Sequence, residues 1–248
     1  MNKVAVITGA SRGIGAATAQ LMAERGFSVG VNYLSNEAAA AAVVRKIELA
    51  GGCAIAVRAD ITQEDQITRL FERVDQQLGR LSVLVNNAGV LEKQMRVDEM
   101  SAERLNRIFA ANVTSYFLCA KAAVRRMSTK YGGGGGAIVN VSSVAARLGS
   151  AGEYVDYAAS KGAVDTLTIG LSKEVATEGI RVNAVRPGFI YTDIHATGGE
   201  PDRVDRVKQA VPMKRGGHPD EVAGAIAWLA SEEAAYVTGT FIDVAGGR

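Results

Sequence analysis

Short runs of β-branched residues alternate along the chain with longer segments in which apolar residues recur at helical spacing. The runs predict strands at residues 4–8, 29–33, 54–58, 82–85, 137–141, 180–185 and 241–244. Helices are predicted over 14–25, 36–50, 64–78, 102–130 and 219–230, and over a segment that carries Tyr157 and Lys161 and ends near 177. Strands that are apolar throughout are typical of a parallel sheet covered on both faces. The pattern therefore predicts an α/β fold, a doubly wound parallel sheet of about seven strands in a single domain over residues 1–248.

Two segments depart from this alternation. Five consecutive glycines occupy residues 132–136, and because no change of composition follows them we interpret them as a flexible surface turn inside the domain. Residues 189–215 are irregular, with a charged helical piece around 202–209. An irregular segment of this length is often a lid over a binding site, so we expect a substrate lid here.

Composition and charge exclude several function classes. The net charge of +2 and the aromatic share of 6% give no sign of a nucleic-acid surface. No apolar run is long enough for a signal peptide or a membrane span, so we expect a cytoplasmic protein without membrane partners. Cys53 and Cys119 stand in apolar surroundings and are predicted to be reduced core residues. His195 and His218 lack neighbours spaced for a metal, so we expect surface histidines and no metal site.

A glycine-rich turn follows the first predicted strand and opens the first predicted helix. It spans residues 8–15 and reads TGASRGIG. Glycines let the backbone turn tightly and approach a diphosphate, which then lies at the positive N-terminus of the helix. Three residues separate the first two glycines, whereas only one separates them in the commonest dinucleotide fingerprint. The turn predicts a dinucleotide cofactor.

The second strand indicates which dinucleotide. NAD-preferring folds usually place a carboxylate at its end, whereas residues 31–36 read VNYLSN here. Arg12 lies inside the glycine turn, where a cation can bind a 2′-phosphate. We therefore predict NADP(H), with Arg12 and the polar end of the second strand holding that phosphate.

Tyr157 and Lys161 lie four residues apart and so share one helix face. A free tyrosine has a pKa near ~10, and a nearby lysine favours the phenolate and lowers that pKa. The pair is therefore a candidate general acid or base at neutral pH.

In their order and spacing, these motifs resemble those of the classical short-chain dehydrogenase/reductase family over nearly the whole chain. The matching positions are the glycine turn, Asp60 after the third strand, the sequence NNAG at 86–89, Asn112, Ser142-Ser143, Tyr157-(three)-Lys161 and Pro187-Gly188. The resemblance implies an enzyme that interconverts a carbonyl and an alcohol by hydride transfer to or from NADP(H).

The resemblance also implies a role for each catalytic residue. Ser143, favoured over Ser142, would steady the developing oxyanion, and Tyr157 would transfer the proton. Lys161 would bind the nicotinamide ribose and, together with the oxidised nicotinamide ring, lower the pKa of the phenol. Asn112 would hold a water that links Lys161 to solvent. The implied cofactor-binding set is Gly9, Ser11, Arg12, Gly13, Ile14, Gly15, Asn32, Tyr33, Ser35, Asp60, Ile61, Asn87, Ala88, Gly89, Tyr157, Lys161, Pro187, Gly188, Ile190 and Thr192.

The substrate is less defined. The end of the chain resembles the branch that contains 3-oxoacyl-carrier-protein reductases and bacterial sugar dehydrogenases. The arginines that dock the carrier in that branch are replaced here by the glycine run and by Glu178, and ordinary helix solvation explains Arg125, Arg126 and Lys130 about as well. A 3-oxoacyl thioester, a sugar or polyol, and a xenobiotic carbonyl all stay open. So does a catalytically idle protein that senses NADP(H).

Two further questions stay open at this stage. The branch usually forms homotetramers, and the apolar residues Ala163, Val164, Leu167 and Leu171 suit either core packing or such an interface. Tyr154 lacks a lysine four residues on, so it is either a wall of the substrate pocket or a packing residue.

Overall fold

One parallel sheet runs through the protein, whose computed structural model describes residues 3–248. Its seven strands are β1 (Lys3–Ile7), β2 (Phe27–Tyr33), β3 (Cys53–Arg58), β4 (Leu81–Asn86), β5 (Gly136–Val141), β6 (Ile180–Pro187) and β7 (Phe241–Val244). They pair in the order β3-β2-β1-β4-β5-β6-β7, parallel throughout. The predicted α/β doubly wound sheet is confirmed. Residues 1 and 2 of the predicted domain lie outside the described residues.

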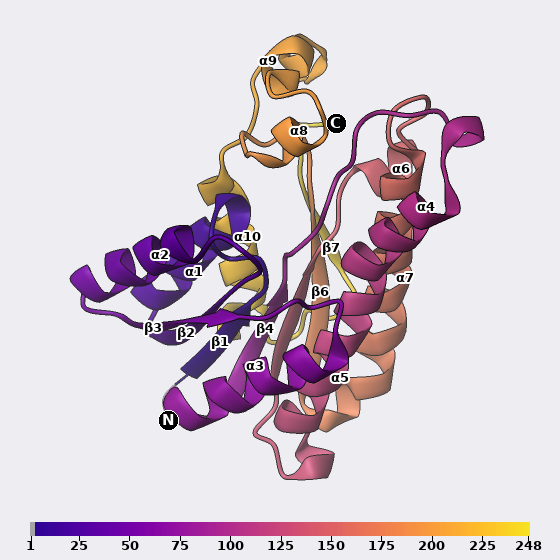
Figure 1. Ribbon diagram of the computed structural model, residues 1–248. Helices are drawn as coiled ribbons and strands as arrows, with labels where there is room; N and C mark the ends of the chain where they lie inside the picture. The colour runs from indigo at the N-terminus through magenta and orange to yellow at the C-terminus, as the bar shows by residue number, and fades with distance from the viewer. Residues whose placement is uncertain (1–2) are drawn as a thin grey trace.

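Helices cover both faces of the sheet (Figure 1). One face carries α1 (Gly13–Glu24), α2 (Glu37–Leu49) and α10 (Pro219–Leu229), and the other carries α3 (Glu64–Gln77), α5 (Ser115–Met127) and α7 (Val155–Val175). Each face buries its own apolar core, with Met22 and Ile226 on the first and Phe71 and Met127 on the second. Because both faces are buried, the strands are apolar at nearly every position.

The predicted helix over residues 102–130 is interrupted. It consists of α4 (Ala102–Phe109), a π-helical turn at Ala110–Thr114 and α5, and it ends at Met127. The pattern also missed the short helices α6 (Ala145–Leu148) and α8 (Ile194–Thr197). The charged piece predicted around 202–209 contains α9 (Arg203–Val207) and a 3₁₀ turn (Lys208–Ala210).

Residues 132–135 of the glycine run form a turn between α5 and β5, as predicted, whereas Gly136 is the first residue of β5. The turn is tightly hydrogen-bonded. The Gly133 amide donates to Ser128 O at 2.7 Å and the Gly135 amide to Met127 O at 2.7 Å. A Cβ on Gly133 would lie 2.0 Å from Met127 O, so this position requires glycine.

The cysteine prediction is half right. Cys119 is buried, but Cys53 is exposed because it begins β3, which is the edge strand of the sheet. Both thiols are free. Within residues 3–248, no helix is long and apolar enough to cross a membrane.

The strand order reverses between β1 and β4, so the loops after these two strands run to opposite sides. In open parallel sheets, ligands bind in the crevice that this reversal leaves at the carboxyl ends of the strands. The glycine turn follows β1 at this edge, and the NNAG motif follows β4.

Candidate active site

The glycine turn is fixed by side chains from two neighbouring strands. The Gly9 amide donates to Asn32 Oδ1 at 3.2 Å, and Asn87 Nδ2 donates to Thr8 O at 2.8 Å and to Gly9 O at 3.2 Å. Gly9 has φ +62°, which favours glycine, and a Cβ on Gly15 would lie 2.5 Å from Asn87 Nδ2. The backbone therefore passes close to the N-terminus of α1, as a diphosphate site requires.

The Asn32 side chain also links two strands, which the sequence did not reveal. Its side-chain amide is buried and also donates to Ala59 O at 3.0 Å, so it ties β2 and β3 to the glycine turn. Asp60, which follows β3, accepts hydrogen bonds from the Thr62 amide and hydroxyl at 2.9 and 2.8 Å.

The residues that follow β2 include no carboxylate, and two arginines from other elements are relevant to this end of the cavity. Arg12 is exposed at the N-cap of α1 and takes part in no ion pair among the residues of the described chain. A second arginine, not considered in the sequence reasoning, contacts the segment after β2, because Arg58 Nε donates to Leu34 O at 3.2 Å. Its position at the end of the neighbouring strand was the available signal.

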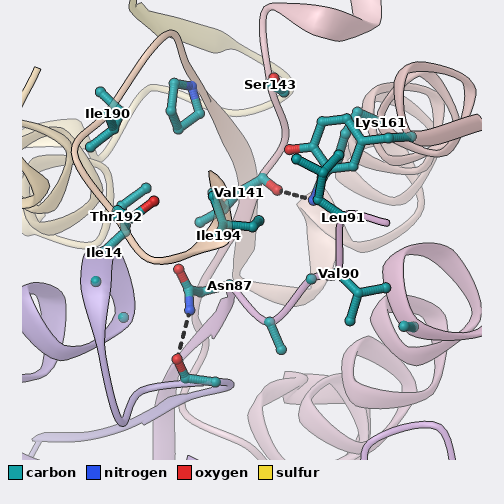
Figure 2. A pocket seen from close by; sticks show the side chains of 18 of the residues that line it. Ile14, Asn87, Val90, Leu91, Val141, Ser143, Lys161, Ile190, Thr192 and Ile194 are labelled. Atoms are coloured by element: carbon teal, nitrogen blue, oxygen red, sulfur yellow. Dashed lines mark hydrogen bonds between the residues drawn. The ribbon is translucent and has the colours of Figure 1, made fainter. Parts of the chain in front are cut away.

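Lys161 and Tyr157 project from α7 toward the end of β5. Lys161 is only 3% exposed, and its Nζ donates to Val141 O at 2.8 Å and to the Tyr116 hydroxyl at 3.3 Å. The ammonium lies 5.7 Å from the centre of the Tyr157 ring. Figure 2 shows the bond from Lys161 to Val141 at one wall of the pocket.

Burial changes the acid–base properties of this pair. It lowers the pKa of Lys161 from 10.5 to about 7, against the raising effect of Asp165. It also raises the pKa of Tyr157, while a hydrogen bond from Ser143 favours the phenolate and works the other way. Desolvation is therefore the largest influence on the phenol in the protein alone, and it acts in the direction opposite to the lowering expected from Lys161.

The two adjacent serines have different surroundings. Ser142 is buried, and its hydroxyl donates to Lys161 O at 3.2 Å, so it is committed to holding α7. The Ser143 hydroxyl faces Tyr157 and accepts a hydrogen bond from the Ala145 amide at 3.1 Å. The geometry favours Ser143 as the residue that contacts a substrate oxygen.

Asn112 lies in the π-helical turn, fully buried behind the site. Its Oδ1 accepts from the Val90 amide at 2.8 Å, and its Nδ2 donates to Val90 O at 3.0 Å and to Ser160 Oγ at 3.2 Å. It thus clamps the segment after β4 to α7. The predicted water that links Lys161 to solvent stays a prediction.

The predicted site residues converge on one cavity of about 620 Å³. All of them line it except Asn112, and Figure 2 shows Ile14, Asn87, Ile190 and Thr192 across from Ser143 and Lys161. For the far end of the cavity, away from the glycine turn, sequence reasoning predicted a lid over residues 189–215 and allowed Tyr154 as a pocket wall, but it missed Val90, Leu91, Val144 and Leu148, which belong to no motif. That end is lined by Val90, Leu91, Val144, Leu148, Tyr154, Phe189, Ile194, His195, Arg203 and Arg248.

Tyr154 and both histidines can now be compared with their predicted positions. Tyr154 is both a cavity wall and a packing residue, since it is 3% exposed and its hydroxyl donates to Gly198 O at 3.1 Å. His195 was predicted at the surface, but α8 turns its ring inward, where Nε2 lies 2.9 Å from Ile190 O. His218 is exposed, as expected. In the described part of the chain, no group of three or more metal-ligating side chains is placed to hold a metal ion.

Comparisons with known proteins agree with this geometry. Residues 9–248 match the family model described as enoyl-(acyl carrier protein) reductase. The chain is 61% identical over 245 residues to the uncharacterized oxidoreductase YgfF of Escherichia coli K12, covering 99% of both proteins. The chain belongs to the short-chain dehydrogenase/reductase family.

Other members of the family are named for different enzymatic activities. The chain is 41% identical to a 3-oxoacyl-[acyl-carrier-protein] reductase of Synechocystis, covering 99% of this chain and 96% of the relative. It is 40% identical to glucose 1-dehydrogenase 2 of Bacillus subtilis, covering 99% and 94%. A solved short-chain dehydrogenase/reductase from Serratia marcescens superposes with a TM-score of 0.91 at 33% identity, covering 99% and 97%. The family therefore shows an oxidoreductase without naming its substrate.

Proposed function

We propose that this protein is an NADP(H)-dependent oxidoreductase that interconverts a ketone or aldehyde with an alcohol. The observation that carries the proposal is the convergence of Ser143, Tyr157 and Lys161 on the cavity that the glycine turn also lines. The nicotinamide, when bound, supplies or accepts the hydride.

The residues at the catalytic end divide the remaining work. In reduction, the Tyr157 hydroxyl donates its proton to the oxygen of the carbonyl, and in oxidation it takes that proton back. Burial raises the pKa of Tyr157, so the phenol keeps its proton at neutral pH, and the Ser143 hydrogen bond acts in the direction that makes it the stronger acid. The Ser143 hydroxyl donates a hydrogen bond to the same oxygen as negative charge develops on it.

Lys161 is arranged to hold the cofactor. An ammonium has three N–H donors, and two of them are committed to Val141 O and the Tyr116 hydroxyl. The third is left for a ribose hydroxyl. A Cβ on Gly89 would lie 3.6 Å from Lys161 Nζ, so glycine at this position keeps the space beside the ammonium open.

The choice of NADP(H) rests on charge at the adenosine end. Arg12 has no carboxylate partner among residues 3–248, and residues 33–36 contain no carboxylate that would repel a 2′-phosphate. An idle NADP(H) sensor is disfavoured, because a sensor needs neither the Ser143–Tyr157 hydrogen bond nor a buried lysine.

Nicotinamide fluorescence tests the proposal directly. The purified protein is titrated with NADPH and with NADH, and NADPH should bind at least tenfold more tightly. Arg12→Ala should weaken NADPH by about tenfold, the loss expected for one charge-assisted contact, and leave NADH within twofold. Arg25→Ala, at the other end of α1, serves as the control. Equal losses of NADPH and NADH on Arg12→Ala would overturn the phosphate contact.

A screen of carbonyl compounds with the preferred cofactor then separates the substrate classes. The classes are 3-oxoacyl thioesters, sugars or polyols, and xenobiotic ketones and aldehydes. The apolar side chains at the far end of the cavity, including Leu91, Val144 and Leu148, favour an apolar carbonyl compound over a sugar. Turnover of none of these compounds would refute the reductase.

We further propose a cytoplasmic homotetramer. The two free thiols support a reducing compartment. A groove between α5 and α7 presents Phe117 with 51% of its surface exposed, and it is also lined by Leu167 and Leu171. An exposed apolar groove of this kind suits an interface between copies of the chain. Light scattering should give the mass of a tetramer and a smaller mass for Phe117→Arg, and a wild-type monomer would refute this assembly.

A further inference from the structure

The ion pair between Arg104 and Asp156 is the most buried one in the described chain. The two side chains are 5% and 1% exposed, and Arg104 Nε lies 2.7 Å from Asp156 Oδ2. A buried ion pair is weak support for stability, because desolvation of the two charges offsets their attraction. Stability alone therefore does not account for the Arg104–Asp156 pair, and the contacts that the two side chains make indicate its role.

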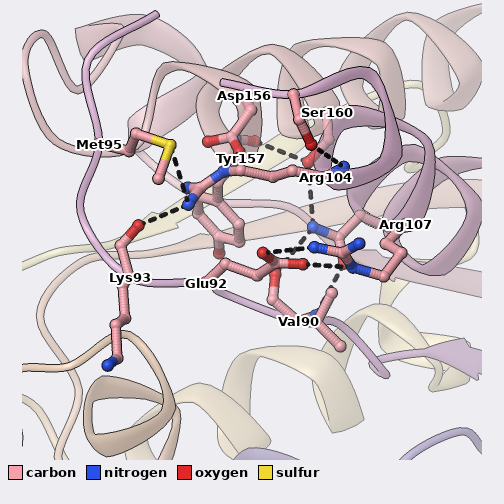
Figure 3. Close-up of polar contacts among 11 residues, drawn as sticks. Val90, Glu92, Lys93, Met95, Arg104, Arg107, Asp156, Tyr157 and Ser160 are labelled. Carbon is pink, nitrogen blue, oxygen red and sulfur yellow. Dashed lines mark hydrogen bonds and ion pairs between the residues drawn. The ribbon is translucent and has the colours of Figure 1, made fainter. Parts of the chain in front are cut away.

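Asp156 joins this pair to the catalytic tyrosine. It lies in the first turn of α7, where backbone amides lack acceptors within the helix. Its second oxygen, Oδ1, accepts a hydrogen bond from the Tyr157 amide at 2.8 Å. One carboxylate thus holds the Tyr157 backbone with one oxygen and Arg104 with the other (Figure 3).

The guanidinium reaches in the opposite direction to the segment after β4. Arg104 Nη1 donates to Lys93 O at 2.7 Å and lies 3.9 Å from Met95 Sδ. The same segment supplies Val90 and Leu91 to the cavity wall. Arg104 Nη2 is buried without a hydrogen-bond partner, so the site does not fully satisfy the charge that it buries. Apolar residues would fill this position at less cost to stability.

We propose that Arg104 and Asp156 are positioning residues, which fix Tyr157 relative to the cavity wall formed by the segment after β4. The chain of contacts runs from Lys93 O through the guanidinium and the carboxylate to the Tyr157 amide, without a water. The inference rests on the proposed role of Tyr157 as the acid. A displacement of about 1 Å at a reacting group can cost about 10²-fold in rate, so a fixed backbone here has a large effect on turnover.

The test is a double variant that removes both charges, Arg104→Met with Asp156→Asn. Removing both avoids a lone buried charge, and asparagine still offers an oxygen to the Tyr157 amide. We expect kcat to fall about 10- to 100-fold, with NADPH affinity within twofold and the melting temperature within a few degrees. Arg107→Met with Glu92→Gln is the matched control, because this exposed pair also joins α4 to the segment after β4 but does not reach α7. The control should keep wild-type kcat.

A spectroscopic readout separates this inference from the proposed function. 3-Fluorotyrosine at position 157 reports its own surroundings by ¹⁹F NMR whether or not a substrate is known. A changed ¹⁹F shift in the double variant and an unchanged shift in the control support the positioning role, even if no carbonyl compound is turned over. An unchanged shift in the double variant, or kcat equal to that of the wild type, would overturn it.

Discussion

Replacing Lys161 with methionine should stabilise the protein without nucleotide while removing its activity. Burial lowers the pKa of Lys161 from 10.5 to about 7, and a tenfold change in proton affinity is worth about 1.4 kcal/mol. The folded state therefore disfavours the charged lysine by up to about 4 kcal/mol at pH 7 relative to the unfolded chain. Methionine has a similar length and no charge, but it loses the bonds to Val141 O and to the Tyr116 hydroxyl, so the net gain should be about 1–3 kcal/mol.

The sign of the pH dependence follows from the same numbers. Between about pH 7 and 10.5 the unfolded chain keeps the proton of Lys161 and the folded chain releases it. The wild type therefore gains stability as the pH rises through this window, whereas the methionine variant has no such group. The advantage of Lys161→Met should be largest at and below pH 7 and should shrink steadily toward pH 10.

Urea unfolding of the nucleotide-free proteins at pH 6, 7, 8 and 9 measures this difference. Contributions from titrating groups that lie far from Lys161 cancel between the two proteins. Lys173→Met is the control, because Lys173 is exposed on the same helix and its loss should change the free energy of unfolding by less than about 0.5 kcal/mol. A methionine variant that is less stable than the wild type at pH 7, or an advantage that does not shrink by pH 9, would refute the reasoning.

Three further substitutions have defined outcomes. Tyr157→Phe should reduce kcat by at least about 10³-fold while NADPH affinity, followed by nicotinamide fluorescence, stays within threefold; wild-type turnover would remove Tyr157 from proton transfer. Gly15→Ala should abolish nucleotide binding and cost about 1–3 kcal/mol of stability by urea unfolding, because its Cβ would meet Asn87 Nδ2 at 2.5 Å. Asn112→Ala should cost about 1–3 kcal/mol in the same assay, because both backbone groups of Val90 lose their partner; an unchanged stability would contradict the clamp.

The sequence predicted those features that depend on local pattern. Continuous apolar strands required a sheet covered on both faces, and the glycine spacing required a tight approach at the N-terminus of α1. Gly9 at φ +62° and the clash that a Cβ on Gly15 would produce are the physical content of that motif. Tyr157 and Lys161 were found because their spacing places them on one helix face, and Ser143 was found because its place after the fifth strand resembles that of the family's serine.

Features that depend on contacts between distant parts of the chain could not be predicted from the sequence. Cys53 has apolar neighbours in sequence, but its exposure is decided by β3 being at the edge, which only the strand order reveals. His195 is buried because a four-residue helix turns its ring toward Ile190 O, and no periodicity exists in so short a segment. A lysine four residues away indicates a charge near Tyr157, but the sequence does not reveal the burial that raises the pKa of the phenol in the protein alone.

The π-helical turn at Ala110–Thr114 shows how a break in pattern serves the site. Apolar spacing across this region predicts one straight helix. In such a helix, the residues of α5 would face a different direction relative to those of α4 than they do across the π-helical turn. The extra residue of the π turn lets α4 and α5 each keep their own buried face while Asn112 points at the Val90 backbone. On α4 the same arrangement leaves Arg104 directed at Asp156. The irregular turn, the amide clamp and the buried ion pair therefore act on one segment, and together they fix the wall of the cavity that faces Tyr157.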